Sequence, residues 1–119
     1  MTECYKFQKL DVYKLALKYV KVIYSVRQKM PDHEKYNLTN QIGRAATSIV
    51  LNIAEGSTGQ SNPEQKRFLG LALRSYLETI ACLDLIEQCG YLQETEVRSL
   101  REQGHQLFIK LSAFRRALK

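Results

Sequence analysis

Two residues of the chain have the spacing of a metal site, because His105 follows Glu102 by three positions. Di-iron helix bundles hold their metals with a Glu-x-x-His motif on each of two helices and a carboxylate from each of the others. The chain has no second such motif, and both residues fall outside the apolar stripe of their predicted helix. Motifs for zinc hydrolases, nucleotide phosphates, dinucleotides and serine hydrolases are also missing. We therefore expect no catalytic residue, metal, cofactor or enzymatic activity.

Positive charge is concentrated near the start of the chain. The net charge is +6, and residues 1–29 hold seven basic and two acidic side chains. Lys14, Lys18 and Lys21 recur at helical spacing with no acidic residue between them. Such a strip suits contact with phosphates, and a solvated lysine face without a ligand is the alternative.

Tyrosines accompany these lysines. Tyr5, Tyr13, Tyr19 and Tyr24 could stack on nucleic-acid bases, but packing at the edge of a core accounts better for most of them. Binding to a membrane surface is less favourable, because a folded core needs the apolar face of the same helix.

Polar side chains also stand among small and apolar residues further along the chain. Arg44, Asn52 and Glu55 do so in one segment, and Arg74 and Glu78 lie four positions apart in the next, within reach of each other. Ion pairs and caps that fix the register of helices explain these five residues best. A functional polar site is the alternative.

The length and composition predict one domain over residues 1–119 with a single core. Cys82 and Cys89 lie too far apart along one helix for a disulfide, so we expect reduced, half-buried packing residues. No apolar run is long enough to span a membrane, and residues 1–6 lack the apolar core of a signal peptide. Together these features predict a cytoplasmic protein.

Apolar residues recur every three or four positions in four segments, as on one face of an amphipathic helix. The spacing predicts helices over residues 11–29, 38–55, 63–89 and from about 93 to the C-terminal end. Short connections favour antiparallel neighbours. The predicted fold class is therefore all-α, an antiparallel up-down four-helix bundle.

The ends of the second and third helices carry capping signals. Asn37 and Asn62 suit the N-cap positions, and Gln65 could complete a capping box with Asn62. Gly56 and Gly90 follow the last apolar residues of these helices and are expected to end them.

An up-down topology places the start of the first helix beside the end of the fourth. A second basic cluster closes the chain, at Lys110, Arg115, Arg116 and Lys119. We therefore expect a basic pole, and a more acidic pole at the connection of the third and fourth helices. The expected phosphate contacts are Lys6, Lys9, Lys14, Lys18, Lys21, Arg115 and Arg116.

The second predicted helix carries a motif that resembles a family signature. Its core is Arg44-Ala45, Ser48-Ile49 and Asn52-Ile53-Ala54-Glu55-Gly56. This pattern is similar to that of the bacterial four-helix-bundle family, also called the large-subunit rRNA intervening-sequence proteins. The resemblance extends over nearly the whole chain, with further matches at Phe7, Leu10, Phe68-Leu69, Leu77-Glu78 and Gly90-Tyr91-Leu92. Val50 departs from the family, which often has proline there.

The resemblance implies an up-down bundle that assembles as a ring-like homopentamer and has no enzymatic activity. A related branch, the accessory variability determinant of diversity-generating retroelements, is a basic protein that binds nucleic acid and a reverse transcriptase. We therefore expect a homo-oligomer that binds structured RNA, another nucleic acid or an RNA–protein complex through a basic surface. A reverse transcriptase or a ribonucleoprotein is the protein partner that this resemblance suggests. The alternative function is a protein-interaction scaffold with no nucleic-acid role.

Overall fold

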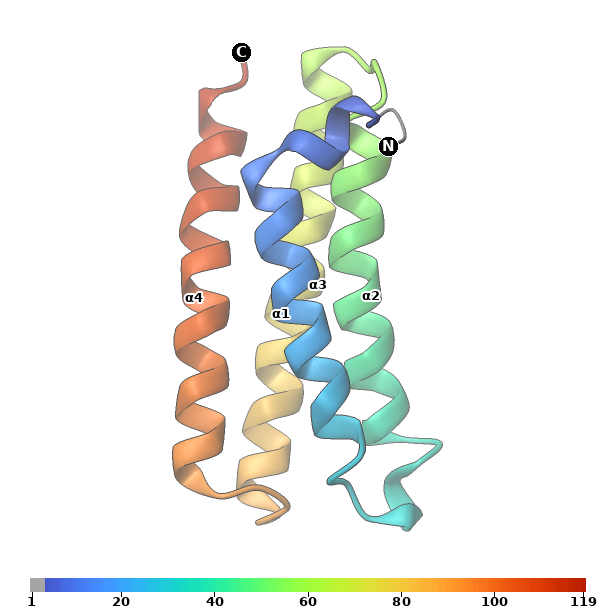
Figure 1. The fold of residues 1–119 in the computed structure, drawn as a ribbon, viewed down its shortest axis with the longest axis vertical. Coiled ribbons are helices and arrows are strands. Elements are labelled where there is room, and N and C mark those ends of the chain that lie inside the picture. The colour runs from blue at the N-terminus through green and yellow to red at the C-terminus, as the bar shows by residue number, and fades with distance from the viewer. Residues whose placement is uncertain (1–3) are drawn as a thin grey trace.

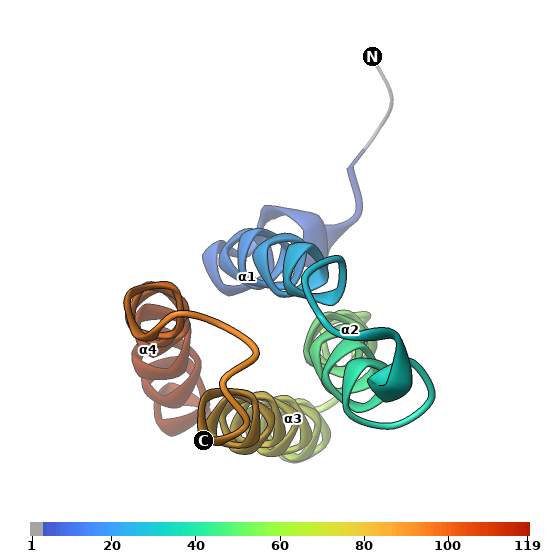
Figure 2. The ribbon, with the colours of Figure 1, turned by 90° about the horizontal axis from the view of Figure 1, so that it is seen from below.

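The structure is a computed structural model that describes residues 4–119, so residues 1–3 of the predicted domain lie outside it. The helices are α1 (Asp11–Arg27), α2 (Leu38–Gly56), α3 (Asn62–Gln88) and α4 (Glu94–Ala117), with short 3-10 helices η1 (Lys6–Lys9) and η2 (Asp32–Glu34) before α1 and α2. Each α-helix runs antiparallel to the one before it (Figure 1). Seen from one end, the four helices occupy four corners in chain order (Figure 2). The predicted all-α, antiparallel up-down bundle is confirmed.

All four apolar stripes meet in one core. Ile23 of α1, Ile49 of α2, Leu83 of α3 and Leu111 of α4 are each 0% exposed. Burying a side chain of this size favours folding by about 2 kcal/mol. Within residues 4–119, no helix combines the length and the apolar character needed to cross a bilayer.

A buried polar contact crosses the core between α1 and α3. The hydroxyl oxygens of Tyr19 and Thr79 lie 2.7 Å apart, and the Thr79 hydroxyl donates to the carbonyl oxygen of Tyr76 at 2.6 Å. A threonine hydroxyl has one proton, so Tyr19 must donate to Thr79. Gly104 of α4 makes room for this arrangement, because a Cβ there would lie 2.8 Å from ring carbons of both tyrosines.

The ends of α3 follow the sequence signals only in part. Gly90 ends the helix as predicted, with a φ of +72° and with the N–H of Tyr91 bonded to the carbonyl of Ile86 at 3.1 Å. The predicted N-cap is off by one residue, because Ser61 accepts the N–H of Glu64 and Asn62 is already helical. The predicted capping box does not form.

The ends of α2 are held by contacts from outside the helix. Asn37 occupies the N-cap position without a side-chain cap, and the Glu34 carboxylate accepts the N–H of Leu38 at 3.4 Å instead. Gly56 is the last helical residue. A Cβ on Gly56 would lie 2.5 Å from the Cβ of Phe68, so this glycine serves close packing on α3.

Candidate nucleic-acid interface

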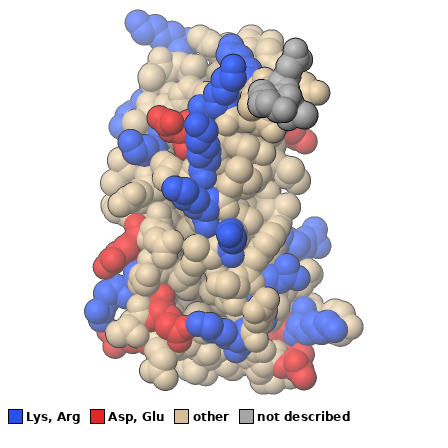
Figure 3. Space-filling model, viewed as in Figure 1, with Lys and Arg blue, Asp and Glu red and all other residues tan. Residues whose placement is uncertain are grey.

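The outer side of α1 carries three exposed lysines, which we call the lysine face: Lys14, Lys18 and Lys21. Their spacing of four and three residues places them opposite the buried side of the helix, which includes Ala16 and Ile23. A row of basic side chains runs along this side of the bundle (Figure 3). At 1.5 Å per residue the lysine face extends for roughly 10 Å along the helix axis.

The charges of the lysine face are not neutralised. No carboxylate of residues 4–119 lies within 4.0 Å of any of its three ammonium groups. Two acidic residues border it: Asp11 in the first turn of α1, and Glu102 of α4, which lines a groove together with Lys18. The positive potential therefore remains available to a polyanion.

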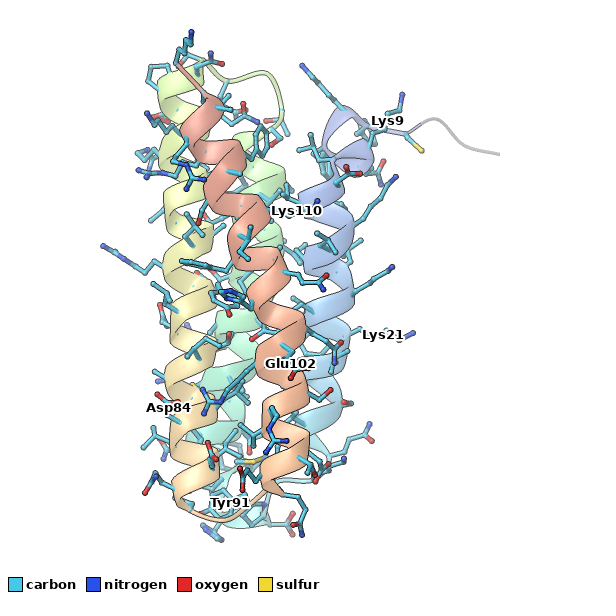
Figure 4. The ribbon with its side chains drawn as sticks, turned by 90° about the vertical axis from the view of Figure 1, so that its left-hand side faces the viewer. Lys9, Lys21, Asp84, Tyr91, Glu102 and Lys110 are labelled. Atoms are coloured by element: carbon cyan, nitrogen blue, oxygen red, sulfur yellow. The ribbon has the colours of Figure 1, made fainter. Side chains whose placement is uncertain are left out.

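Lys6 and Lys9 extend this surface towards the start of the chain. Both lie exposed on η1, which contacts α1 and α2. Lys9 and Lys21 project from the same side of the bundle (Figure 4). Five of the predicted phosphate contacts therefore share one surface. We call it the basic surface; it comprises Lys6, Lys9, Lys14, Lys18 and Lys21.

Arg115 and Arg116 diverge from each other and from the lysine face. Arg115 lies against α3, where its Nε–H donates to the carbonyl oxygen of Lys66 at 3.1 Å and its guanidinium packs over Gly70. Arg116 is exposed on the outer side of α4. The structure therefore does not bring Arg115 to the basic surface, and its contact with α3 assigns it to packing of the bundle.

Lys110 joins the basic surface in place of Arg115. It follows Gln103 and Gln106 at helical spacing, and these two residues line the groove between α1 and α4. Lys110 lies on the side of α4 that faces α1 (Figure 4). Its spacing from the two glutamines is visible in the sequence, but the sequence does not show which side of α4 faces α1.

At the other end of the bundle, basic side chains lie against carboxylates. The Arg101 guanidinium lies 2.9 Å from carboxylate oxygens of both Asp84 and Glu87, and so ties the end of α3 to the start of α4. The predicted acidic pole does gather carboxylates here, but a cation offsets them.

Two further pairs complete this end. Arg98 lies 3.1 Å from Glu94, and Lys29, in the turn after α1, pairs with Glu96. The hydrogen bond from Lys29 holds the pKa of Glu96 below its ordinary value. We call this region the paired end; it comprises Lys29, Asp84, Glu87, Glu94, Glu96, Arg98 and Arg101.

A hydrogen-bonded cluster lies beside the paired end. The hydroxyl of Tyr91 donates to Glu34 at 2.9 Å, and Nε2 of His33 lies 3.1 Å from the same hydroxyl. This bond holds the pKa of Glu34 below its ordinary value and raises the pKa of Tyr91 to about 12. The cluster joins the α1–α2 connection to the α3–α4 turn.

The predicted network of ion pairs on α2 and α3 does not form within the chain. Arg44, Glu55, Arg74 and Glu78 are exposed, and within residues 4–119 none of them lies within 4.0 Å of an opposite charge. The expected Arg74–Glu78 pair is therefore wrong. An ion pair between exposed side chains contributes little free energy, because ordering the two side chains costs entropy. These four groups therefore remain in solvent.

Smaller polar groups connect α2 and α3 instead. The Ser75 hydroxyl donates to the Ser48 hydroxyl at 3.0 Å, across the seam between the two helices. The amide of Asn52 donates to the carbonyl of Ser48 at 2.9 Å and to its hydroxyl at 3.0 Å. Asn52 is therefore the member of the predicted network that has a structural role in the single chain.

The residues that could hold a metal do not gather. Glu102 and His105 are both exposed on α4, and the His105 ring stacks on Phe108 at 6.3 Å between centroids. Within residues 4–119 there is no group of three His, Cys, Asp or Glu placed to bind a metal ion.

Cys82 and Cys89 are free thiols, as predicted. Cys82 is buried, which raises the pKa of its thiol. Cys4 and Cys89 are exposed, so the prediction of half-buried packing is wrong for Cys89.

The outer groove between α3 and α4 has a different character from the lysine face. It has a volume of about 620 Å³ and a mainly apolar floor, which includes Leu77, Ile80 and Phe108. Its rim includes Arg98 and Arg101, whose guanidinium groups already pair with carboxylates of the paired end. The groove suits an apolar partner better than a phosphate.

Comparison with known proteins gives a family match over most of the chain. The family model described as 23S rRNA-intervening sequence protein matches residues 8–113. The fold is similar to the crystal structure of a protein of unknown function from the S23 ribosomal protein family of Bacteroides thetaiotaomicron, with a TM-score of 0.82. The two are 23% identical over 89% of this chain and 96% of that one. No curated protein matches the sequence.

Proposed function

The chain belongs to the 23S rRNA-intervening sequence protein family, and from this premise we propose that it is a non-enzymatic, homo-oligomeric bundle that binds RNA. The contact surface in this proposal is the lysine face, extended by Lys6, Lys9 and Lys110. The name of the family refers to 23S rRNA, so RNA is the polyanion that we favour over DNA. An RNA–protein complex, or a reverse transcriptase together with its RNA, fits the same surface.

The observation that carries this proposal is the contrast in pairing of the basic side chains. Lys29, Arg98 and Arg101 have carboxylates within 4.0 Å, whereas Lys14, Lys18 and Lys21 have none within residues 4–119. Like charges in one row repel each other, and a bound phosphate backbone relieves that repulsion and releases its own counterions.

The proposed assembly is a homo-oligomer, and a ring of five is the form that the family resemblance suggests. Leu51, Leu77, Leu85 and Ile109 are all more than half exposed, on α2, α3 and α4. Contacts between copies through these helices would bury apolar side chains and leave the lysine face of α1 outward. Sedimentation velocity tests this proposal, and a single species of the monomer mass would contradict it.

RNA binding is tested by the triple variant Lys14→Gln, Lys18→Gln and Lys21→Gln. Its matched control is Lys35→Gln, Arg67→Gln and Arg98→Gln, which removes equal charge from exposed positions elsewhere. We expect the first variant to bind a structured RNA about 100-fold more weakly than wild type at low salt, and the control to lose far less. Equal losses in both variants would mean that net charge alone attracts RNA.

A second candidate function is a protein-interaction scaffold with no nucleic-acid role. The apolar groove between α3 and α4, with Leu77 53% exposed, favours this function. The scaffold hypothesis predicts RNA binding that is weak and equal for the two triple variants. It also predicts that Leu77→Lys would disrupt the protein's interactions while Lys18→Gln would not.

A further inference from the structure

Tyr5 presents an aromatic ring to solvent at the head of the basic surface. Its side chain is 74% exposed. The other tyrosines near the lysines are less available: Tyr19 is buried, Tyr13 is half-buried, and the Tyr24 hydroxyl is bonded to Thr47 of α2. Tyr5 therefore differs from the tyrosines that packing explains.

The exposed ring is held in place by contacts on two sides. The Tyr5 N–H donates to the side-chain oxygen of Gln8 at 2.7 Å, and the Gln8 N–H donates to the Tyr5 carbonyl at 3.0 Å. The Tyr5 ring stacks on Phe7 at 6.3 Å and 15°, and Phe7 packs edge-on against Tyr13 of α1 at 5.0 Å. This series of aromatic contacts links Tyr5 to α1 and leaves most of its ring exposed.

The charges around Tyr5 suit a nucleotide. Lys6 is its chain neighbour and Lys9 ends the same 3-10 helix; both are exposed, and within residues 4–119 no carboxylate lies within 4.0 Å of either. An aromatic face beside unpaired cations can take the base and the phosphate of one nucleotide together.

From this geometry we propose that Tyr5 stacks on an unpaired base, so that the RNA bound along α1 carries a single-stranded loop, bulge or end at η1. The inference rests on the proposed RNA-binding function and adds the class of nucleotide recognised. A base inside a duplex has no free face for Tyr5, whereas unpaired nucleotides are the usual targets of aromatic side chains in RNA recognition. The lysine face then holds the backbone that leads to this nucleotide.

The test compares Tyr5→Ala with Tyr5→Phe and with Tyr36→Ala, measured by fluorescence anisotropy on a labelled oligouridylate. Tyr36 is a matched control, because it is an 87% exposed tyrosine beside a lysine on the α1–α2 connection, far along the bundle from η1. We expect Tyr5→Ala to weaken binding about tenfold, and Tyr5→Phe and Tyr36→Ala to change it less than twofold. A ribose-phosphate oligomer without bases, and a blunt RNA duplex, should bind wild type and Tyr5→Ala equally.

The dependence of affinity on salt separates stacking from charge. Tyr5→Ala should leave the slope unchanged, since it removes no phosphate contact, whereas each lost lysine contact lowers the slope by roughly 0.7–0.9. Two results would overturn this inference alone: Tyr5→Ala leaves the affinity for oligouridylate unaltered, or wild-type protein binds the base-free oligomer as tightly as it binds oligouridylate. A wild-type protein that binds neither oligouridylate nor structured RNA at about 50 mM salt would overturn the proposed function, and this inference with it.

Discussion

The lysine face and the paired end use the same kinds of side chain for opposite purposes. At the paired end, Arg101 touches two carboxylates and joins α3 to α4. On the lysine face, Lys14, Lys18 and Lys21 touch no carboxylate of residues 4–119, and they join nothing within the chain. A charge whose partner lies on a neighbouring helix helps to join the two helices, and a charge without a partner is available to a ligand. The number of charged residues therefore indicates little until their partners are known.

Reversing the charge of the lysine face should have the largest effect on RNA affinity. Changing Lys14, Lys18 and Lys21 to glutamate replaces attraction of RNA phosphates by repulsion, and we expect at least a 100-fold loss of RNA affinity at about 100 mM salt. Filter binding over a salt series measures it. The urea unfolding curve of the same variant should match that of wild type, because these side chains form no ion pair with residues 4–119. A loss of stability would show that the lysine face has a structural partner.

Neutralising one cation in each region sharpens the comparison. Arg101→Met keeps an unbranched aliphatic stem but removes the guanidinium, and so leaves Asp84 and Glu87 without a cation. Since the Arg101 side chain is 33% exposed and its partners are more exposed, we expect a loss of about 1 kcal/mol in the free energy of unfolding. Lys18→Met should change it by less than about 0.5 kcal/mol. Equal effects of the two variants in urea titrations would remove the distinction between the two regions.

Two substitutions on α4 test how far the proposed RNA-binding surface extends beyond the lysine face. Lys110→Gln should weaken RNA binding about threefold, because Lys110 lies on the side facing α1. Arg115→Gln should leave RNA binding unchanged and slightly destabilise the bundle, because it loses the bond to the carbonyl of Lys66. Anisotropy titrations and thermal melts of both variants check this. The opposite assignment, with Arg115 required for RNA and Lys110 not, would place the RNA on the other side of α4.

The smallest effect is expected beside the paired end, at low pH. The hydrogen bond from Tyr91 depresses the pKa of Glu34 below its ordinary 4.5 in the folded chain. The stability that Glu34 contributes is therefore fully present at a pH above the ordinary pKa of 4.5. It is lost as the pH falls through the lower pKa of the folded state. Tyr91→Phe should lose less stability than wild type between about pH 5 and pH 3, as measured by urea midpoints. Parallel pH profiles of the two proteins would show that this bond does not stabilise the fold.

Much of the architecture was predictable from local pattern. Four periodic segments gave four helices, and the caps were predictable where one residue decides the geometry, as at Gly90, whose φ of +72° few other residues adopt. The errors occurred where partners come from elsewhere in the chain. The N-terminal end of α2 is closed by the Glu34 carboxylate rather than by the Asn37 side chain. Gly56 does end α2 as predicted, but the sequence did not show that Phe68 packs against it.

For the candidate site, too, one part was predictable from the sequence and another part was not. That Lys14, Lys18 and Lys21 lie opposite the buried face of α1 follows from the period of the helix alone. That Lys110 belongs with them and Arg115 does not could not be read from the sequence. The two residues border the same buried stripe of α4, and the stripe leaves open which side faces α1 and which faces α3.

By itself, the sequence determined which side of each helix is buried, because side-chain direction on a helix depends only on position along that helix. It thereby also determined that a row of lysines points to solvent. Only the tertiary structure decided which charges find partners on another helix, because such an ion pair forms only when the packing brings opposite charges within about 4 Å. That distance depends on the order, rotation and tilt of the helices around the core. The unpaired state of the lysine face and the exposure of Tyr5 are therefore properties of the packed bundle.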